Sequence, residues 1–411
     1  MAPAPPHHVV VGGSAAGVAA AFGLREHGFT GRVTLVDAGT DLPYERPPLS
    51  KPSGGHPAPR PIMPSSAYRE QGIELRLGVA VRDLDTGTRT VTLDDGDRIA
   101  ADAVLLATGV SPRRLDIPGR GLDNVLVLRD IDDARAWAAR LAAAGPVVLL
   151  GGGFIGLEAA AVARRRGLPV TVVEATALPL GAALGPELAR LVVQQHVAHG
   201  VRFHTGRHAT ALHGAGAVEQ VELDDGTRLP AATVLVGCGV VPNDALARRA
   251  GADTGDGIRV DGHGRTSVPW VWAAGDVAAY FSPYTGRVQR IEHWDVASRH
   301  GRAVGASMAG VHTVSAEAPY FWSDQYDRRL QMFGRARPGD RMVLRPDAGP
   351  EHFLGFWVRD GCLVAAAGLD AARQLRAAKP LIERRIPVDP AALADPSVDL
   401  RSLVRAGTAA A

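Results

Sequence analysis

Two stretches of the chain share one pattern of apolar and polar positions. In the first, HVVVGGSAAG at residues 8–17 passes from an apolar strand into a small-residue turn and a helical stretch that reaches about residue 27. In the second, PVVLLGGGFIG at residues 146–156 does the same, and its helical stretch reaches about residue 166. A further apolar strand follows each helix, RVTLVD at 32–37 and VTVVE at 170–174, and each ends on an acid. The pattern predicts two β–turn–α–β units whose first turn glycines, Gly12 and Gly151, lie 139 residues apart.

The residue types in these two units are those that bind a dinucleotide. A first glycine allows the tight turn, a second lets the backbone approach a pyrophosphate, and a third lets the helix pack against the strand. The phosphate binds the amides at the helix N-terminus, and the acid accepts hydrogen bonds from ribose hydroxyls. The positions concerned are Gly12, Ser14, Gly17 and Asp37 in the first unit, and Gly151, Gly153, Gly156 and Glu174 in the second. The alternative is a pair of ordinary α/β turns that need glycine for a positive φ.

Outside these units the pattern predicts antiparallel strands. Residues 81–99 and 218–229 alternate in polarity around Asp-Asp-Gly turns, and each set precedes a buried strand ending in glycine, at 103–109 and 233–239. From residue 319 onward, aromatic residues and short alternating strands indicate a separate α+β domain. We therefore predict an α/β protein with two Rossmann-like dinucleotide-binding domains and a C-terminal α+β domain. The first domain is discontinuous, at 1–112 and 245–318, the second covers 113–244, and the third covers 319–411.

Composition excludes several other classes of protein. Among the 411 residues, 46% are apolar and 21% charged, which excludes a disordered chain. The net charge of +2 is too small to indicate nucleic-acid binding through bulk charge. No secretion signal is visible, and glycines and Glu158 interrupt the apolar run at 146–163, so we expect a cytoplasmic protein with no membrane span. Of the 45 basic residues only Lys51 and Lys379 are lysines, which draws attention to both.

The cysteines limit the redox chemistry that the chain can perform. Cys238 and Cys362 lie far apart in apolar runs, and we expect both to be buried and neither to form a disulfide or a metal site. Flavoprotein reductases that relay electrons through a dithiol need a close cysteine pair. Peroxide-reducing relatives use a cysteine in the N-terminal unit, and this chain has none before Cys238. Neither chemistry is expected here.

Five further motifs connect these units to a known family. In chain order they are PYERPPLSK at 43–51, ATG at 107–109, TSVPWVWAAGD at 266–276, EHWD at 292–295 and FWSDQ at 321–325. Together with the two glycine turns, they resemble the oxygenase-coupled NADH:ferredoxin reductases, the putidaredoxin reductase-like flavoproteins with a glutathione-reductase-like arrangement of FAD and NAD domains. The resemblance covers about residues 8 to 400. The chain departs from the family pattern at Ser14 and in the segment AAAGLD at 365–370, which lacks an expected Asn-Arg pair.

The resemblance implies a role for each matched position. It assigns FAD to the first unit and NADH to the second. Beyond the turn residues, the expected FAD-binding positions are Arg46, Lys51, Thr108, Gly109, Gly275, Asp276, His293 and Trp294. Among these, Arg46 and Lys51 would lie near the isoalloxazine, Asp276 would bind the ribityl chain, and His293 and Trp294 would border the pyrimidine edge of the ring. The expected catalytic residues are Lys51, Glu158 and Trp322, and no metal is expected.

Charge balance supports one part of this assignment. A buried lysine needs a counter-charge, so we expect Lys51 to pair with Glu158, with the cation close to flavin N5. A cation there would stabilise negative charge on the reduced flavin. Each residue also has a simpler interpretation: Lys51 as a surface residue after a Pro-rich loop, Glu158 as a polar position on an apolar helix, Trp322 as a core aromatic and His293 as a structural histidine.

The expected activity is NADH-dependent reduction of a 2Fe–2S ferredoxin that serves a cytochrome P450 or a ring-hydroxylating oxygenase. NADH is favoured over NADPH because no arginine follows Glu174 before Arg190 to bind a 2′-phosphate. Acidic ferredoxins would be steered by basic residues; candidates are Arg299, Arg302, Arg328, Arg329, Arg335 and Arg337. Two alternatives remain: a flavin oxidase acting on a small molecule, and a non-catalytic FAD-bearing binding protein. Either a monomer or a homodimer is compatible with the sequence.

Overall fold

The computed structural model describes residues 4–52, 57–346 and 353–409. The chain forms two compact units, each of which is described by itself. Unit 1 contains Met1–Arg46, Ala58–Ser111 and Val241–Pro319, and unit 2 contains Pro47–Pro57, Pro112–Val240 and Tyr320–Ala411. The three domain ranges expected from the sequence remain a prediction.

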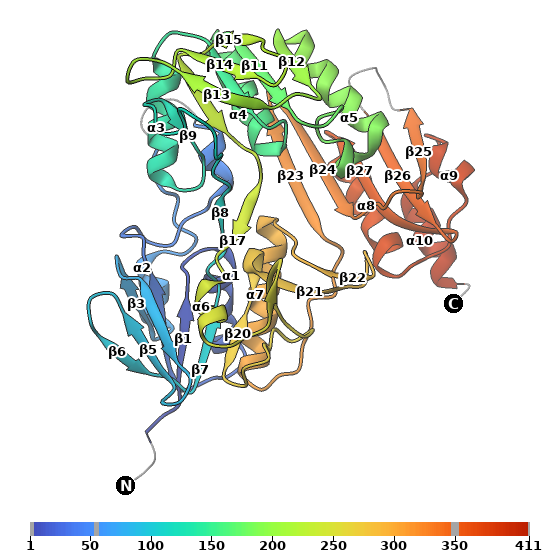
Figure 1. Cartoon of the computed structure of the whole chain (residues 1–411). Coiled ribbons are helices and arrows are strands. Elements are labelled where there is room, and N and C mark those ends of the chain that lie inside the picture. The colour runs from blue at the N-terminus through green and yellow to red at the C-terminus, as the bar shows by residue number, and fades with distance from the viewer. Residues whose placement is uncertain (1–3, 53–56, 347–352, 410–411) are drawn as a thin grey trace. The chain divides into compact units, whose positions relative to one another are not determined.

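Unit 1 is built on a five-stranded parallel sheet in the order β20-β7-β1-β2-β3 (Figure 1). Its strands are β1 (His7–Val11), β2 (Arg32–Asp37), β3 (Ile73–Leu77), β7 (Ala103–Leu106) and β20 (Val271–Ala273). All five residues of β1 are buried, His7 and His8 together with the apolar run Val9–Val11, so the strand does not alternate between apolar and polar positions. The strand–helix–strand connection from β1 to β2 is the predicted first unit.

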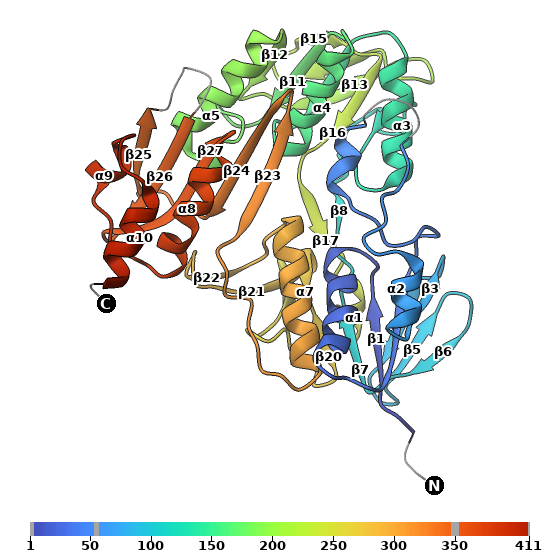
Figure 2. The same cartoon turned by 180° about the vertical axis from the view of Figure 1, so that it is seen from behind.

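Two helices of unit 1 lie side by side, α1 (Ala15–Glu26) and α7 (Trp294–Met308) (Figure 2). Their backbones approach closely because α7 has Gly301 and Gly305 at the contact. A Cβ at either glycine would overlap the main chain of α1, at Ala16 and Ala20. Close packing of this kind leaves no room for a larger side chain at either position.

The remaining elements of unit 1 are short. The strands β4 (Val81–Asp85), β5 (Thr90–Leu93) and β6 (Arg98–Ala100) form the predicted antiparallel set, with the turn at 94–97 between β5 and β6. A second small sheet has the order β18-β19-β21-β22. Its strands are β18 (Thr254–Gly255), β19 (Gly257–Arg259), β21 (Ala278–Ser282) and β22 (Arg287–Gln289). The other helical segments of unit 1 are α2 (Ser65–Glu70), α6 (Ala245–Arg249) and η2 (Gly275–Val277).

Unit 2 contains a second parallel sheet, in the order β12-β11-β10-β16-β9. Its strands are β9 (Val125–Leu126), β10 (Val147–Leu150), β11 (Val170–Glu174), β12 (Val201–Thr205) and β16 (Thr233–Val236). The helical elements are η1 (Pro47–Ser50), α3 (Ile131–Ala142), α4 (Phe154–Arg165) and α5 (Gly181–Ala198). The strands β13 (Ala209–His213), β14 (Gln220–Leu223) and β15 (Arg228–Pro230) form an antiparallel sheet around the predicted turn at 224–226.

The C-terminal part of unit 2 is an antiparallel sheet in the order β23-β24-β27-β26-β25. Its strands are β23 (Tyr320–Gln325), β24 (Arg328–Gly334), β25 (Arg341–Pro346), β26 (Phe353–Arg359) and β27 (Cys362–Leu369). The helices α8 (Ala372–Glu383), α9 (Pro390–Ala394) and α10 (Leu400–Ala409) follow it.

Two further short strands, β8 (Val110–Pro112) and β17 (Val240–Pro242), pair with each other.

The expected fold class agrees with these elements: two parallel sheets with β–turn–α–β units and a C-terminal α+β part. The apolar run at 146–163 contains β10 and α4, as predicted. Within the described ranges, no helix combines the length and apolar character that crossing a bilayer requires.

Candidate functional site

The first glycine turn joins β1 to α1 in unit 1. Gly12 has φ +111°, and a Cβ there would lie 2.8 Å from the carbonyl carbon of Ala107, so no other residue fits without backbone movement. A Cβ at Gly17 would overlap the carbonyl oxygen of Gly12. The carboxylate of Asp37, at the end of β2, accepts a hydrogen bond from the Gly13 amide. The acid of this unit therefore reaches the turn itself.

The second glycine turn, in unit 2, repeats this geometry from β10 to α4. Gly151 has φ +107°, and a Cβ on Gly156 would overlap the Gly151 carbonyl oxygen. Oε2 of Glu174 accepts from the Gly152 amide at 2.7 Å, and Oε1 accepts from the amide and hydroxyl of Thr176, each at 2.8 Å. Both turns thus leave their acid at the strand end, where a ribose hydroxyl would be bound.

The middle position of each turn explains why serine is tolerated in the first. Ser14 and Gly153 are both helix N-caps with extended backbone, and the Ser14 side chain makes no cap hydrogen bond. A Cβ on Gly153 would meet nothing within 4 Å. The glycine of the motif is therefore not needed here for packing within the protein, and the small side chain of Ser14 fits the same position.

Lys51 and Glu158 form an ion pair within unit 2, as expected. Lys51 follows η1, and Glu158 lies on α4, 107 positions further along the chain. The Lys51 Nζ is 3.0 Å from Glu158 Oε2 and 3.8 Å from an oxygen of Asp324 on β23. The side chains of Lys51 and Glu158 are only 17% and 7% exposed, so water screens the pair weakly.

The Glu158 carboxylate is surrounded by hydrogen-bond donors. Oε2 accepts from Lys51 and from the hydroxyl of Ser50, while Oε1 accepts from the Ser323 hydroxyl at 2.8 Å and the Asp324 amide at 3.1 Å. Four donors around one carboxylate match the acceptor capacity of the ionised form. The site is therefore built to hold Glu158 as an anion, with Lys51 as its counter-charge.

Trp322, the third expected catalytic residue, lies on β23 beside this cluster. Side chains alternate along a strand, so Trp322 shares a sheet face with Asp324 and opposes Ser323. The Trp322 ring stacks on Tyr320 with centroids 5.8 Å apart and is partly buried. Asp324, which shares the face of Trp322, also lies 3.8 Å from the Lys51 Nζ.

Arg46 lies beside the first glycine turn. Its Nε donates to the Ser14 hydroxyl at 3.3 Å, and its guanidinium lies over the Tyr44 ring at 5.8 Å. This placement adds a cation to the amides at the start of α1, which is the chemistry that a pyrophosphate requires. Its expected position near the isoalloxazine remains a prediction.

Thr108 and Gly109 lie in a linker that is held by Asn243, a residue that sequence reasoning missed. The Thr108 hydroxyl donates to the Asn243 carbonyl at 2.8 Å, and the Asn243 side-chain amide donates to the Thr108 carbonyl at 2.9 Å. The backbone amide of Asn243 also donates to the Gly109 carbonyl at 3.0 Å. Thr108 therefore uses its hydroxyl within the protein, and its role toward a cofactor remains a prediction.

Gly275 and Asp276 begin η2, and a buried histidine supports them. The Gly275 amide donates to Nδ1 of His300 at 3.2 Å, and burial lowers the pKa of His300 to about 4, which keeps it a neutral acceptor. His293 is the N-cap of α7 and Trp294 its first residue. The contacts of Asp276, His293 and Trp294 with a flavin remain predictions.

The expected basic candidates are mostly paired with acids. Ion pairs join Arg299 to Asp295 and Glu317, Arg302 to Glu26, Arg328 to Asp370, and Arg329 to Asp324. Each of these acids offsets the field that its arginine would contribute to steering a partner.

The expectation that both cysteines are buried is wrong, because Cys238 and Cys362 are each only partly buried.

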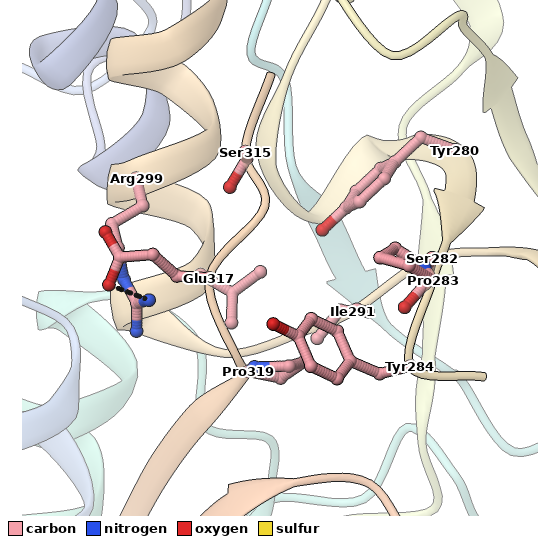
Figure 3. A pocket seen from close by; sticks show the side chains of 10 residues that line it. Tyr280, Ser282, Pro283, Tyr284, Ile291, Arg299, Ser315, Glu317 and Pro319 are labelled. Atoms are coloured by element: carbon pink, nitrogen blue, oxygen red, sulfur yellow. Dashed lines mark hydrogen bonds and ion pairs between the residues drawn. The ribbon is translucent and has the colours of Figure 1, made fainter. Parts of the chain in front are cut away.

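A small cavity in unit 1 is lined by none of the expected catalytic or cofactor-binding residues (Figure 3). Its volume is about 10 Å³, enough for about one water molecule. The Arg299–Glu317 ion pair lies at one side and Tyr280 at the other, where burial raises the pKa of the phenol to about 12. A cavity of this size holds neither a dinucleotide nor an organic substrate.

Comparison with known proteins identifies the class to which this fold and these turns belong. The family described as pyridine nucleotide-disulphide oxidoreductase matches residues 6–301, and the one described as reductase C-terminal matches 320–404. The chain therefore belongs to the pyridine nucleotide-disulphide oxidoreductase family.

Its relatives are similar over nearly their whole length. The ferredoxin reductase component of chlorobenzene dioxygenase from Cupriavidus sp. (strain PS12) is 37% identical over 402 residues, covering 97% of this chain and 98% of the relative. The ferredoxin–NAD(+) reductase component of the p-cumate 2,3-dioxygenase system of Pseudomonas putida is 36% identical, covering 96% and 97%. The crystal structure of the covalent putidaredoxin reductase–putidaredoxin complex contains a chain that matches with a TM-score of 0.93 and 33% identity, covering 99% and 100%. The predicted resemblance is confirmed.

Proposed function

We propose that the protein is an FAD-dependent NADH:ferredoxin reductase that supplies single electrons to a 2Fe–2S ferredoxin of an oxygenase system. The observation that carries this proposal is the pair of equivalent turns, each with an acid bonded to its amide, together with the buried Lys51–Glu158 pair. The relatives named as ferredoxin reductase components of dioxygenase systems, similar over 96–97% of this chain, support ferredoxin as the acceptor.

The residues of the first turn fit FAD. The turn amides and Arg46 would bind the pyrophosphate, and Asp37 would accept from ribose hydroxyls. When bound, FAD accepts a hydride from NADH and gives up its electrons singly, which couples a two-electron donor to a one-electron carrier. Lys51 keeps a positive charge close to β23, and Glu158 holds that charge in place through a 3.0 Å contact.

The residues of the second turn fit NADH better than NADPH. Glu174 would accept from the adenosine ribose, and its charge would repel a 2′-phosphate. One arginine near this position was missed from sequence: the Arg207 amide donates to the Glu174 carbonyl at 3.1 Å. However, the Arg207 guanidinium is bonded to Asp225 at 3.1 Å and lies 3.5 Å from Asp224. Those two acids hold it away from a phosphate-binding role.

The chain offers no alternative route for the electrons through sulfur. Its two cysteines are both free thiols, and burial raises the pKa of Cys238, which disfavours the nucleophilic thiolate. A cytoplasmic location fits the proposed activity, because NADH is produced and consumed inside the cell.

The test is anaerobic stopped-flow absorbance of the purified protein. Mixing with NADH should bleach the flavin spectrum rapidly, mixing with NADPH should do so slowly, and a 2Fe–2S ferredoxin should then restore the oxidised spectrum. Absence of a flavin spectrum would overturn the proposal. Flavin that is reduced but reoxidised only by oxygen or an organic molecule would favour the oxidase alternative. Flavin that is barely reoxidised by any acceptor would favour a binding protein.

A further inference from the structure

A chain of buried polar side chains leads away from Glu158 through unit 2. It crosses from α4 through β23 to α5, and its members are 7% exposed or less. The contacts are Ser323 Oγ to Glu158 Oε1 at 2.8 Å, Gln325 Nε2 to Ser323 Oγ at 3.1 Å, Gln325 Oε1 to His196 Nε2 at 2.8 Å, and His196 Nδ1 to the Tyr326 hydroxyl at 3.0 Å. Buried polar groups in an unbroken series of this kind polarise one another.

The carboxylate fixes the direction of every hydrogen bond in this chain. An ionised Glu158 can only accept, so Ser323 must donate its hydroxyl proton to it. Ser323 then accepts from the Gln325 amide, which turns the Gln325 carbonyl oxygen toward His196. That oxygen needs a donor, so His196 carries its proton on Nε2. His196 Nδ1 is then an acceptor, and the Tyr326 hydroxyl donates to it.

The surroundings of His196 hold it in this neutral form. The residue is fully buried, and burial lowers its pKa to about 4. Its ring lies edge-on to Phe203, with centroids 6.4 Å apart. Burial also raises the pKa of Tyr326, so the phenol keeps the proton that it donates.

The backbone at Tyr326 provides separate evidence that this end of the chain is held in place. Tyr326 has φ +55°, in the left-handed region that bulky residues rarely occupy. Together with Asp327 it forms the two-residue connection between β23 and β24. A two-residue hairpin requires a positive φ at its first residue, a position that usually holds glycine or asparagine. Here it holds a tyrosine whose phenol bonds His196 and whose ring stacks on His199 at 3.6 Å.

We propose that His196, Gln325 and Ser323 are positioning residues that orient the Glu158 carboxylate, and through it Lys51, for flavin reduction. The proposal rests on the proposed function for its kinetic consequence. None of the three side chains makes an ion pair with Lys51. They act by delivering one directed hydrogen bond to Glu158 Oε1, which leaves Oε2 for Lys51. An apolar core at these positions would be cheaper in desolvation, so the polar series indicates a role beyond packing.

The first test is the tautomer of His196 in the wild-type, FAD-loaded protein. Nitrogen-15 NMR of the histidine rings at pH 7, with His196 assigned by difference from H196Q, should give a neutral ring protonated on Nε2. A ring protonated on Nδ1, or an imidazolium, would reverse or break the chain and overturn the proposal. This measurement needs no turnover, so it decides the positioning chain even if NADH does not reduce the flavin.

The second test compares variants by the rate and KM of flavin reduction by NADH. H196L removes both contacts and should lower the maximal rate about tenfold, with KM for NADH changed less than about twofold, as expected for a supporting residue. H196Q can both donate and accept and should recover most of the rate. H213L is the control, because His213 lies on β13 of the same unit and bonds Glu222 instead of a member of the chain; its rate should equal that of wild type.

An epistasis measurement separates positioning from general loss of packing. In an E158Q background, H196L should lower the rate by less than about twofold further, because its effect passes through the missing carboxylate. An unchanged rate in H196L alone, or the full tenfold loss repeated in the E158Q background, would overturn the proposal. A wild-type protein whose flavin NADH fails to reduce would instead refute the proposed function.

Discussion

Replacing Lys51 by methionine tests how much the Lys51–Glu158 ion pair contributes to the free energy of unfolding. The substitution removes the cation 3.0 Å from Glu158 while keeping most of the side-chain volume. Breaking a buried pair from one side costs about 3–5 kcal/mol, because a charge remains without its partner. Here Glu158 retains three hydrogen-bond donors, so we expect the free energy of unfolding to fall by about 2–3 kcal/mol.

The chain supplies its own matched control, because it has only one other lysine. Lys379 pairs with Glu383 at 3.5 Å across one turn of α8, and the two side chains are only partly buried, at 31% and 27% exposed. Ion pairs of this kind contribute about 0.2–0.5 kcal/mol, so K379M should lose no more than that. The comparison keeps the substitution the same and contrasts a buried, multiply hydrogen-bonded pair with a more exposed pair within one helix.

The assay is urea unfolding of the flavin-loaded variants, followed by circular dichroism and flavin fluorescence, together with the rate of flavin reduction by NADH. K51M should also slow that rate by at least about tenfold, which corresponds to about 1.4 kcal/mol of activation free energy. The double variant K51M/E158Q should be more stable than the sum of its single variants predicts, by about 1–3 kcal/mol. Equal losses in K51M and K379M, or strict additivity in the double variant, would refute the reasoning.

Three further results are expected from other parts of the molecule. G151A should abolish binding of NADH in equilibrium titrations, because residue 151 has φ +107° and its Cβ would lie 2.8 Å from the carbonyl carbon of Gly237. G153A should bind NADH within about tenfold of wild type, because its Cβ would meet nothing within 4 Å. Equal loss of binding in both variants would contradict the turn geometry. D224A/D225A should free the guanidinium of Arg207 and raise the relative affinity for 2′,5′-ADP over 5′-AMP by about tenfold in calorimetry, and an unchanged ratio would exclude Arg207 from selectivity. His300 has a folded pKa of about 4 against an ordinary value of 6.5, so its contribution to stability is complete above pH 6.5 and is lost as pH falls through about 4. Between pH 7 and pH 5, the free energy of unfolding of H300Q in urea should therefore fall by about 2 kcal/mol less than that of wild type. Parallel pH profiles would show that His300 does not cause the acid loss of stability.

The glycine turns could be predicted from sequence because their constraint is local. A positive φ at Gly12 and the contact between Gly17 and the turn depend on residues within six positions of each other. The acids that end β2 and β11 follow from the same short pattern, since each lies about 20 residues from its turn. The Lys51–Glu158 pair could be predicted for a different reason: a buried lysine requires an anion, and the family resemblance indicated which one.

The surroundings of that pair could not be predicted from the same reasoning. Ser50, Ser323 and His196 reach Glu158 or its neighbours from three elements far apart in the chain, and serine and histidine have many ordinary roles. The FWSDQ motif drew attention to its tryptophan, whereas the serine and glutamine of the same strand proved to form the buried chain. Asn243 was missed likewise, because its partner Thr108 lies 135 positions away and nothing local marks the contact.

The acids at the two strand ends have a consequence for how quickly a nucleotide can be captured. Asp37 and Glu174 each accept a hydrogen bond from a turn amide, Gly13 in one unit and Gly152 in the other. Because these bonds lie within the protein, they restrain the turns and reduce the conformational entropy that nucleotide binding would remove. We therefore expect nucleotide association to be limited by diffusion and orientation rather than by rearrangement of the turns.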